Sequence, residues 1–504
     1  MGKFKILIMI VLIFIVVIHC ISFNDKPADP GDESYYIILA KSVIQTGEIR
    51  LLHYFDTPID NIGRFVFIYL ISPLVKLSNN FKYIPVRIEN MFFYIFGLIV
   101  FYITILKYFN RSFNYTEIIF ILLLTGLWPW ALKTSSTLLT EPLFFLESMI
   151  LIYLVYSIQE SRVNINKFLF ITLFSVVAIF TRISGYLFIM FIFILLIKEK
   201  YYKYFFYYFI IIMLSLFIYH QSNVNLDNGL INPNNNANYT KSIYDGILLI
   251  IKNPMVLIKN FIVQLSSIFP QNILPILNIS NNPYFNYPII TVLCYLIGSF
   301  ITIFYFIFYF YCEDKKIKFL YVLLIINVIM LSSREDLISK RHYLFLNPYI
   351  ILTSVMMIKR YLKKYVKYAL ISLMIFTIIP DLDVINDSNK EYMVEKSRPE
   401  YEIYEWINRN SIIGTKSIGE IRPRGYYLYT GNKITYLSRH TEFVKYFINN
   451  DFQGLKKEEG IDYIIIYEDN NNNKSLSNYY SQINSSLKLI FVTQSYPRLE
   501  VFIL

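Results

Sequence analysis

The sequence is poor in charge and in cysteine. Only 16% of its 504 residues are charged, whereas 55% are hydrophobic, and the mean hydropathy is +0.45. An ordinary soluble domain does not need this balance, so the composition excludes that class and predicts a polytopic membrane protein. The three cysteines, Cys20, Cys294 and Cys312, lie in or beside apolar segments and have no paired spacing. They indicate neither a disulfide framework nor a cysteine metal site.

Glycine and proline are also few, with 16 and 18 residues, and most of them lie at the ends of apolar segments. A transporter or flippase is expected to have repeated halves, or helices that these residues break near the midplane of the membrane. The sequence has no evident internal repeat, and its charges concentrate at the ends of the apolar segments. These features do not favour a non-enzymatic transporter or flippase, which stays an alternative.

The net charge of +11 comes from Lys and Arg residues that cluster in short loops between apolar runs. Such clusters orient membrane helices, so we expect no binding to nucleic acid. The first apolar run, from Ile6 to Ile18, follows a basic start and is not followed by a small-residue cleavage site. It predicts an uncleaved first helix whose basic end lies in the cytoplasm.

Apolar runs long enough to cross a bilayer follow one another along most of the chain. Because a span needs roughly 17 to 25 apolar residues, the sequence predicts about eleven membrane helices. The candidates are 4–23, 86–106, 115–133, 142–158, 167–181, 184–198, 203–220, 288–311, 317–333, 342–358 and 365–380. The run from Phe65 to Leu77 is short and contains Pro73, so we expect it to lie along the membrane surface.

The basic loops then fall on one side of the membrane, which the positive-inside rule assigns to the cytoplasm. The outer side holds a first loop, 24–85, a long loop, 221–287, and everything after Pro380. A few basic residues break the trend by falling on this outer side, and they are candidates for holding an anion. These residues are Arg182, Arg334, Lys340 and Arg341.

The last part of the chain, 381–504, becomes mixed and charged, which predicts a small extracytoplasmic α/β domain after a membrane domain, 1–380. The run RPEYEIYEWINRN has the pattern of an amphipathic helix, and IDYIIIYED that of a buried strand. The runs LKLIFVTQ and RLEVFIL predict a terminal hairpin.

Acidic residues stand at two places on the predicted outer side. Asp32 and Glu33 follow the first apolar segment in GDESYY, and Glu141 stands in SSTLLTEPLFF. We expect these carboxylates to share one extracytoplasmic chamber, where a carboxylate within hydrogen-bond reach can take a proton from an attacking hydroxyl. The alternative is structural, because acids favour helix N-termini and Glu141-Pro142 is a plausible helix start.

Several short motifs, in this order and on this side, resemble the GT-C membrane glycosyltransferases. The likeness is greatest to the branch with protein O-mannosyltransferases and lipid A aminoarabinose transferases. The motifs are GDESYY, FDTP, PVRIEN, LTEPLFFL, TRISG, RHYLFLNP, YYLYTG and DYIIIY. The resemblance implies a polyprenyl-phosphate sugar donor, transfer on the outer face of the plasma membrane, and inversion at the anomeric carbon. It places the two family acids on Asp32 and Glu141.

A departing polyprenyl phosphate needs cations to hold its charge, and Arg182, Lys340 and Arg341 are the candidates for that role. Arg182 has an alternative reading as a snorkelling arginine at a helix end. Some relatives bind a divalent metal near a first-loop acid, which would implicate Asp56 with His53. Thr57 stands where relatives often have a basic residue.

Other residues and functions stay open. Glu147 lies deeper in the helix that Glu141 begins and is kept out of the site, while His220 at a helix end is a weak metal candidate. Another membrane enzyme, a glycan polymerase or ligase with a lipid-diphosphate donor, would rely on basic residues more than on an early acid pair. The early GDESYY motif favours a transferase that uses a lipid-phosphate donor and an acceptor of protein, lipid or glycan.

Overall fold

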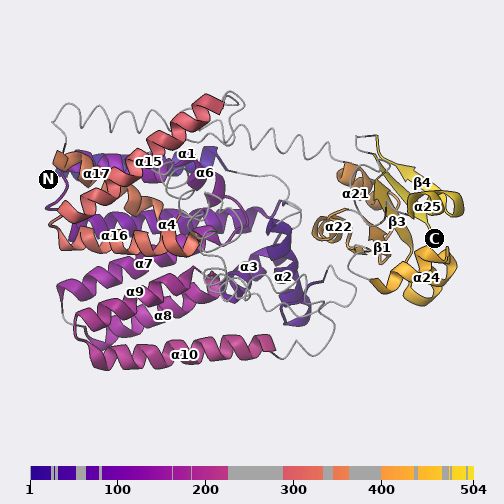
Figure 1. Cartoon of the computed structure of the whole chain (residues 1–504), viewed down its shortest axis with the longest axis horizontal. Coiled ribbons are helices and arrows are strands. Elements are labelled where there is room, and N and C mark those ends of the chain that lie inside the picture. Colours follow the sequence, from indigo (N-terminus) through magenta and orange to yellow (C-terminus); the bar gives the residue numbers. More distant parts are fainter. Residues whose placement is uncertain are drawn as a thin grey trace. The chain divides into compact units, whose positions relative to one another are not determined.

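The computed structural model describes two compact units (Figure 1). The helical unit comprises Met1–Asn24, Ile62–Phe67 and Arg87–Asn386, and the mixed unit comprises Asp25–Asn61, Ile68–Val86 and Asp387–Leu504. Within them the structure describes residues 2–23, 28, 32–52, 64–78, 82–161, 163–182, 184–224, 288–332, 344–361, 399–419, 421–435, 437, 441–467, 476, 479–494 and 498–504. Most of the predicted first outer loop, 24–85, thus falls into one unit with the tail of the chain.

The helical unit is a bundle whose helices occur at most of the predicted spans. They are α1 (Gly2–Ile21), α4 (Ile84–Tyr108), α5 (Tyr115–Gly126), α6 (Pro129–Ser135), α7 (Glu141–Glu160), α8 (Ile165–Thr181), α9 (Gly185–Lys198), α10 (Tyr202–Val224), α15 (Pro288–Tyr311), α16 (Lys315–Ser332) and α17 (Asn347–Tyr361). Figure 1 shows α7, α8, α9 and α10 side by side, and successive members of this row contact each other. The candidate span 365–380 lies outside the described residues.

One predicted span is broken. The run 115–133 forms two helices, α5 and α6, which are separated at Leu127 and Trp128. Pro129 is the cause, because proline cannot donate a helical hydrogen bond and fits only the first turn of a new helix. Among the described helices, α4 and α7 are long and apolar enough to cross a membrane by themselves, and several others are shorter apolar helices. The total of about eleven spans stays a prediction.

Large apolar side chains face both the interior and the outside of the helical unit. Phe101 packs against Tyr349 inside, with ring centroids 5.7 Å apart. On the outside, Ile13, Phe217 and Phe310 are each more than half exposed. Helices that are apolar all round are typical of a membrane span or of the core of a large protein. Because these side chains are exposed in the described unit, they favour lipid as its surroundings.

Basic residues tie several helix ends together at one end of this bundle. Lys359 of α17 donates to Glu117 of α5 at 3.0 Å and to the Ser112 carbonyl at 2.7 Å. Lys316 of α16 donates to the Tyr108 carbonyl at 3.2 Å. These segments are the ones that the sequence places together on the cytoplasmic side. Which side of a membrane this end faces stays a prediction.

The mixed unit contains a five-stranded sheet of order β2-β1-β3-β5-β4. Strand β1 (Lys416–Gly419) pairs in parallel with β2 (Lys433–Thr435) and β3 (Tyr463–Tyr467), whereas β5 (Leu499–Ile503) runs antiparallel to β3 and β4 (Lys488–Val492). The remaining described elements are α21 (Pro399–Arg409), α22 (Pro423–Thr430), η6 (Thr441–Phe443), α23 (Val444–Ile448), α24 (Phe452–Glu459) and α25 (Tyr480–Ser486). The predicted helix, buried strand and terminal hairpin are present.

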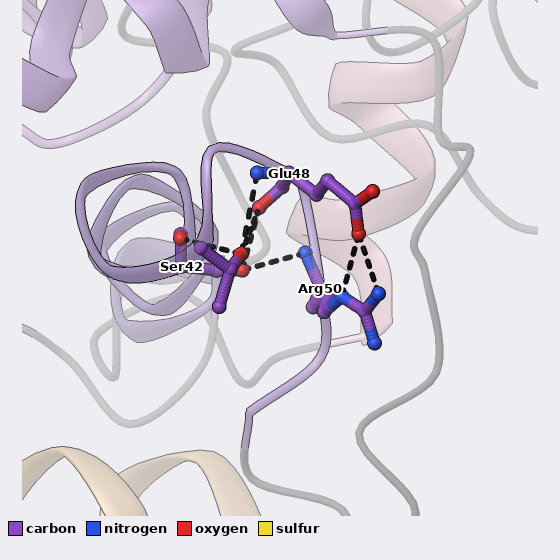
Figure 2. Close-up of polar contacts among 4 residues, drawn as sticks. Ser42, Glu48 and Arg50 are labelled. Atoms are coloured by element: carbon purple, nitrogen blue, oxygen red, sulfur yellow. Dashed lines mark hydrogen bonds and ion pairs between the residues drawn. The ribbon is translucent and has the colours of Figure 1, made fainter.

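Two helices are described in the segment 24–85, the predicted first outer loop: α2 (Asp32–Thr46) and α3 (Phe65–Lys76). The turn that ends α2 is fixed by its own polar groups (Figure 2). Ser42 Oγ donates to the Glu48 carbonyl at 2.7 Å and accepts from the Arg50 amide at 2.8 Å. Gly47 has a φ of +75°, which glycine adopts without strain. These contacts fix the helix end that lies away from the acid pair.

Candidate functional site

Glu141 and Arg182, two of the predicted site residues, form an ion pair in the helical unit. Arg182 Nη1 lies 2.9 Å from Glu141 Oε1, and the two side chains are 12% and 5% exposed. The same nitrogen donates to Thr140 Oγ1 at 3.3 Å. Glu141 is the first residue of α7 and Pro142 the second, so the structural reading of Glu141 as a helix start also holds. Glu141, predicted as a catalytic carboxylate, and Arg182, predicted as a phosphate-binding cation, are therefore ion-pair partners.

The segment that leads into Glu141 is irregular and buried, and residues of α4 satisfy its carbonyl groups. Arg87 is fully buried and donates through Nη1 to the Ser136 carbonyl at 2.9 Å. Asn90 donates to the Thr137 carbonyl and, at 3.1 Å, to the Leu139 carbonyl. Both residues belong to the PVRIEN motif, for which the sequence indicated no role. Buried carbonyls outside regular structure need such donors, because an unsatisfied polar group is costly.

A buried histidine fixes the start of the same segment. His19 of α1 bonds through Nε2 to the Gly126 carbonyl and through Nδ1 to Ser135 Oγ, each at 2.8 Å. Gly126 ends α5, so its carbonyl lacks the partner that a continuous helix would supply. We call residues 135–141 the clamped segment, because side chains of α1, α4 and the end of α8 hold it.

Replacement of Asn90 by leucine is expected to lower the stability of the protein by about 2 kcal/mol or more. Leucine has a similar volume but cannot donate to Thr137 and Leu139, whose buried carbonyls would then lose this donor. Thermal unfolding in detergent measures the effect. Asn410→Leu is the matched control, because Asn410 is exposed and its side chain donates to the carbonyl of Trp406, in the helix that Asn410 follows, at 2.8 Å. Equal unfolding temperatures for the two variants would contradict the role of Asn90.

Glu147 is a further buried carboxylate of α7 that the sequence analysis kept out of the site. Its Oε1 accepts from Thr181 Oγ1 at 2.7 Å, and its Oε2 has no hydrogen-bond partner among the described residues. Thr181 immediately precedes Arg182 in the sequence. Consecutive residues at the end of α8 thus contact Glu141 and Glu147 of α7, which ties Glu147 structurally to the Glu141–Arg182 pair.

Asp32 and Glu33 form the first turn of α2 in the mixed unit. Carboxylates are favoured there by the helix dipole, as the structural reading of the pair proposes. Glu33 is 7% exposed, and every residue from Ser34 to Ala40 is buried. Tyr429 of α22 donates through its hydroxyl to the Ala28 carbonyl at 2.7 Å, just before the acid pair. Glu33 is thus buried and Asp32 half-buried, and both belong to the first turn of a helix that packs inside the mixed unit.

Several predicted site residues lie outside the described residues. They are His53, Asp56, Lys340 and Arg341. Within the described ranges, no group of three or more His, Cys, Asp or Glu side chains could hold a metal ion. The proposed metal site stays a prediction, and so do the phosphate-binding roles of Arg182, Lys340 and Arg341 and a chamber shared by Asp32 and Glu141.

Comparisons with known proteins give no match by sequence, neither to a family nor to a curated protein. The structure, by contrast, is similar to that of ArnT from Cupriavidus metallidurans in the apo state, with a TM-score of 0.60. At 10% identity, the likeness covers 99% of this chain and 98% of ArnT. The chain has the fold of ArnT, which is a member of the GT-C superfamily. The family resemblance expected from the motifs is confirmed at the level of fold.

Two further GT-C structures agree. ArnT from the same organism bound to undecaprenyl phosphate matches with a TM-score of 0.61 at 10% identity, over 98% of this chain and 97% of ArnT. The archaeal oligosaccharyltransferase AglB from Archaeoglobus fulgidus, in complex with an inhibitory peptide and a dolichol-phosphate, matches with a TM-score of 0.51 at 9% identity. That likeness covers 91% of this chain and 69% of AglB.

Proposed function

We propose that this chain is an integral membrane glycosyltransferase, which moves a sugar from a polyprenyl-phosphate carrier to an acceptor outside the cytoplasm. The observation that carries the proposal is the full-length likeness to ArnT, one structure of which holds undecaprenyl phosphate. AglB, a second protein of this fold, is an oligosaccharyltransferase and holds a dolichol-phosphate. The exposed apolar side chains of the helical unit add independent support for a membrane location.

The proposed reaction is a single displacement at the anomeric carbon. The acceptor oxygen forms a bond to that carbon as the bond between the carbon and the phosphate oxygen breaks. The electron pair of the broken bond leaves with the polyprenyl phosphate, and the proton of the acceptor passes to a carboxylate base. Attack opposite the departing phosphate inverts the configuration of the sugar. The phosphate leaves as a stable anion, so cations rather than a protonating acid assist its departure.

We assign the base to Asp32, with Glu33 as its neighbour in the same helical turn. Glu141 would position the acceptor or share the role of base. Arg182, together with Lys340 and Arg341, would hold the donor phosphate. A guanidinium carries five N–H donors, more than the contacts of Arg182 to Thr140 and Glu141 use. In this proposal Glu141 also fixes the orientation of Arg182.

Purified protein in lipid nanodiscs is expected to transfer sugar from at least one undecaprenyl-phosphate sugar in a panel of donors and acceptors. Mass spectrometry of the lipid should then find one undecaprenyl phosphate released for each sugar transferred. The matched control is the same sugar on undecaprenyl diphosphate, which should not be used. Transfer from the diphosphate donor alone would favour a polymerase or ligase and contradict the proposal.

A further inference from the structure

Two contacts join α22 to the segment that carries Asp32 and Glu33. Before the acid pair in the sequence, the Ala28 carbonyl accepts a hydrogen bond of 2.7 Å from the Tyr429 hydroxyl. After the pair, the Arg424 guanidinium carbon lies 4.3 Å from the centroid of the Tyr35 ring. Ala28 and Tyr35 are buried, and α2 packs directly against α22 within the mixed unit. The acid pair is therefore held on both sides by one helix of the tail.

Tyr429 is itself held firmly by α21. Its ring stacks on Tyr404 with centroids 5.3 Å apart and an interplanar angle of 7°, and it meets the edge of Tyr401 at 5.5 Å. Asn408 of the same helix donates to the Tyr429 carbonyl at 3.1 Å. Because these contacts fix the Tyr429 ring, its hydroxyl has little freedom to move if the backbone at Ala28 moves. The Ala28 carbonyl is therefore positioned by the tail.

Helix α22 is also anchored to the sheet. It begins with Pro423 and ends at Thr430, and the following Gly431 has a φ of +74°, the left-handed cap that glycine adopts without strain. The buried Tyr426 hydroxyl lies 3.1 Å from Ser417 Oγ of β1. Sheet, α22 and the start of α2 thus form a continuous series of contacts.

The Tyr429 hydroxyl is protonated near neutral pH, so it can donate its hydrogen bond to Ala28. Burial raises the pKa of Tyr429 well above its usual range, and Tyr401 and the nearby Glu33 contribute in the same direction. The hydroxyl therefore stays protonated and keeps its donor role. A single neutral hydrogen bond is weak compared with the buried packing around it, so its loss is expected to displace α2 rather than unfold the unit.

We propose that α22 positions the acid pair for sugar transfer, with Tyr429 and Arg424 as positioning residues. The inference rests on the proposed function, because it assigns α22 to the same reaction. Catalytic groups need alignment to well within an ångström, and a small displacement costs rate rather than substrate binding. The tail of the chain then contributes to the chemical step itself, and not only to the access of the acceptor.

The kinetic test compares Tyr429→Phe and Arg424→Lys with two controls, one on the same helix and one at the residue before it. Tyr427→Phe removes a hydroxyl from a half-buried neighbour, and Arg422→Lys changes an exposed arginine at the helix start. Tyr429→Phe is expected to lower kcat about tenfold with KM within about twofold, because binding is left intact. Arg424→Lys keeps the charge but loses the flat guanidinium, and a similar fall in kcat is expected. If Tyr429→Phe and Arg424→Lys both had the kcat of the two control variants, the proposal would be overturned.

A second measurement needs no substrate and separates this inference from the proposed function. Hydrogen exchange at the amides of the first turns of α2 should be about fivefold faster in Tyr429→Phe than in Tyr427→Phe. Unchanged exchange overturns the inference, whatever the activity. If the wild-type protein transfers no sugar, the proposed function fails, while faster exchange still supports α22 as the support of the acid pair. Faster exchange with unchanged kcat would overturn the positioning role.

Discussion

Asp32→Asn is expected to lower kcat about a thousandfold, because general-base catalysis by a positioned carboxylate contributes on the order of a hundredfold to ten-thousandfold. Asparagine has the same shape and is also favoured at helix N-termini, so α2 is expected to keep its start. Initial rates of sugar transfer, with the active donor at saturation, measure the effect. The loss should appear in kcat with KM nearly unchanged, since the carboxylate acts on the reacting proton.

Two control variants make this result specific. Glu33→Gln changes the adjacent carboxylate in the same turn and should cost clearly less than Asp32→Asn. Glu48→Gln changes an exposed carboxylate at the other end of the α2 segment and should leave kcat unchanged. Equal turnover by Asp32→Asn and wild type would remove Asp32 from the reaction. A greater loss in Glu33→Gln would move the role of base to Glu33.

The second large effect concerns the Glu141–Arg182 pair. Either single variant, Glu141→Leu or Arg182→Leu, breaks the ion pair of a buried charge and should lower stability by about 3 to 5 kcal/mol. The double variant replaces both charges with apolar groups and should recover most of that stability, as replaced buried pairs often do. Thermal unfolding of the four proteins completes a double-mutant cycle.

Activity then separates a structural pair from a functional one. The double variant is expected to fold but to bind undecaprenyl phosphate poorly and to transfer sugar at less than about a hundredth of the wild-type rate. Loss of lipid binding can be measured directly by native mass spectrometry. A stable double variant with wild-type transfer would mean that the pair only supports the start of α7.

Much of the architecture could be predicted from the sequence because long apolar runs and short charged loops have clear physical causes. The helix, buried strand and hairpin of the tail were predicted from their residue periodicity, and the GT-C fold from the order of the motifs. The short strands β1 and β2 were not, since four and three residues are too few to show a period. The break between α5 and α6 was also missed, although Pro129 is a visible signal.

The candidate site was predicted less completely than the fold. The sequence singled out Glu141 and Arg182, but it could not indicate that they pair, because pairing depends on how α7 and the end of α8 pack. Arg87, Asn90 and His19 were missed as the residues that hold the clamped segment. A rule that treats any ionisable residue within an apolar span as functional until explained would have found Arg87. The functional roles predicted for all the site residues stay predictions: Asp32, Glu33, Glu141, Arg182, His53, Asp56, Lys340 and Arg341.

The anomeric configuration of the transferred sugar tests the central claim most directly. With a pure undecaprenyl-phosphate donor of known configuration, NMR of the product gives the stereochemistry of a single turnover. A single displacement assisted by a carboxylate base predicts an inverted product together with free undecaprenyl phosphate. A product with the configuration of the donor would require two displacements and would contradict the account.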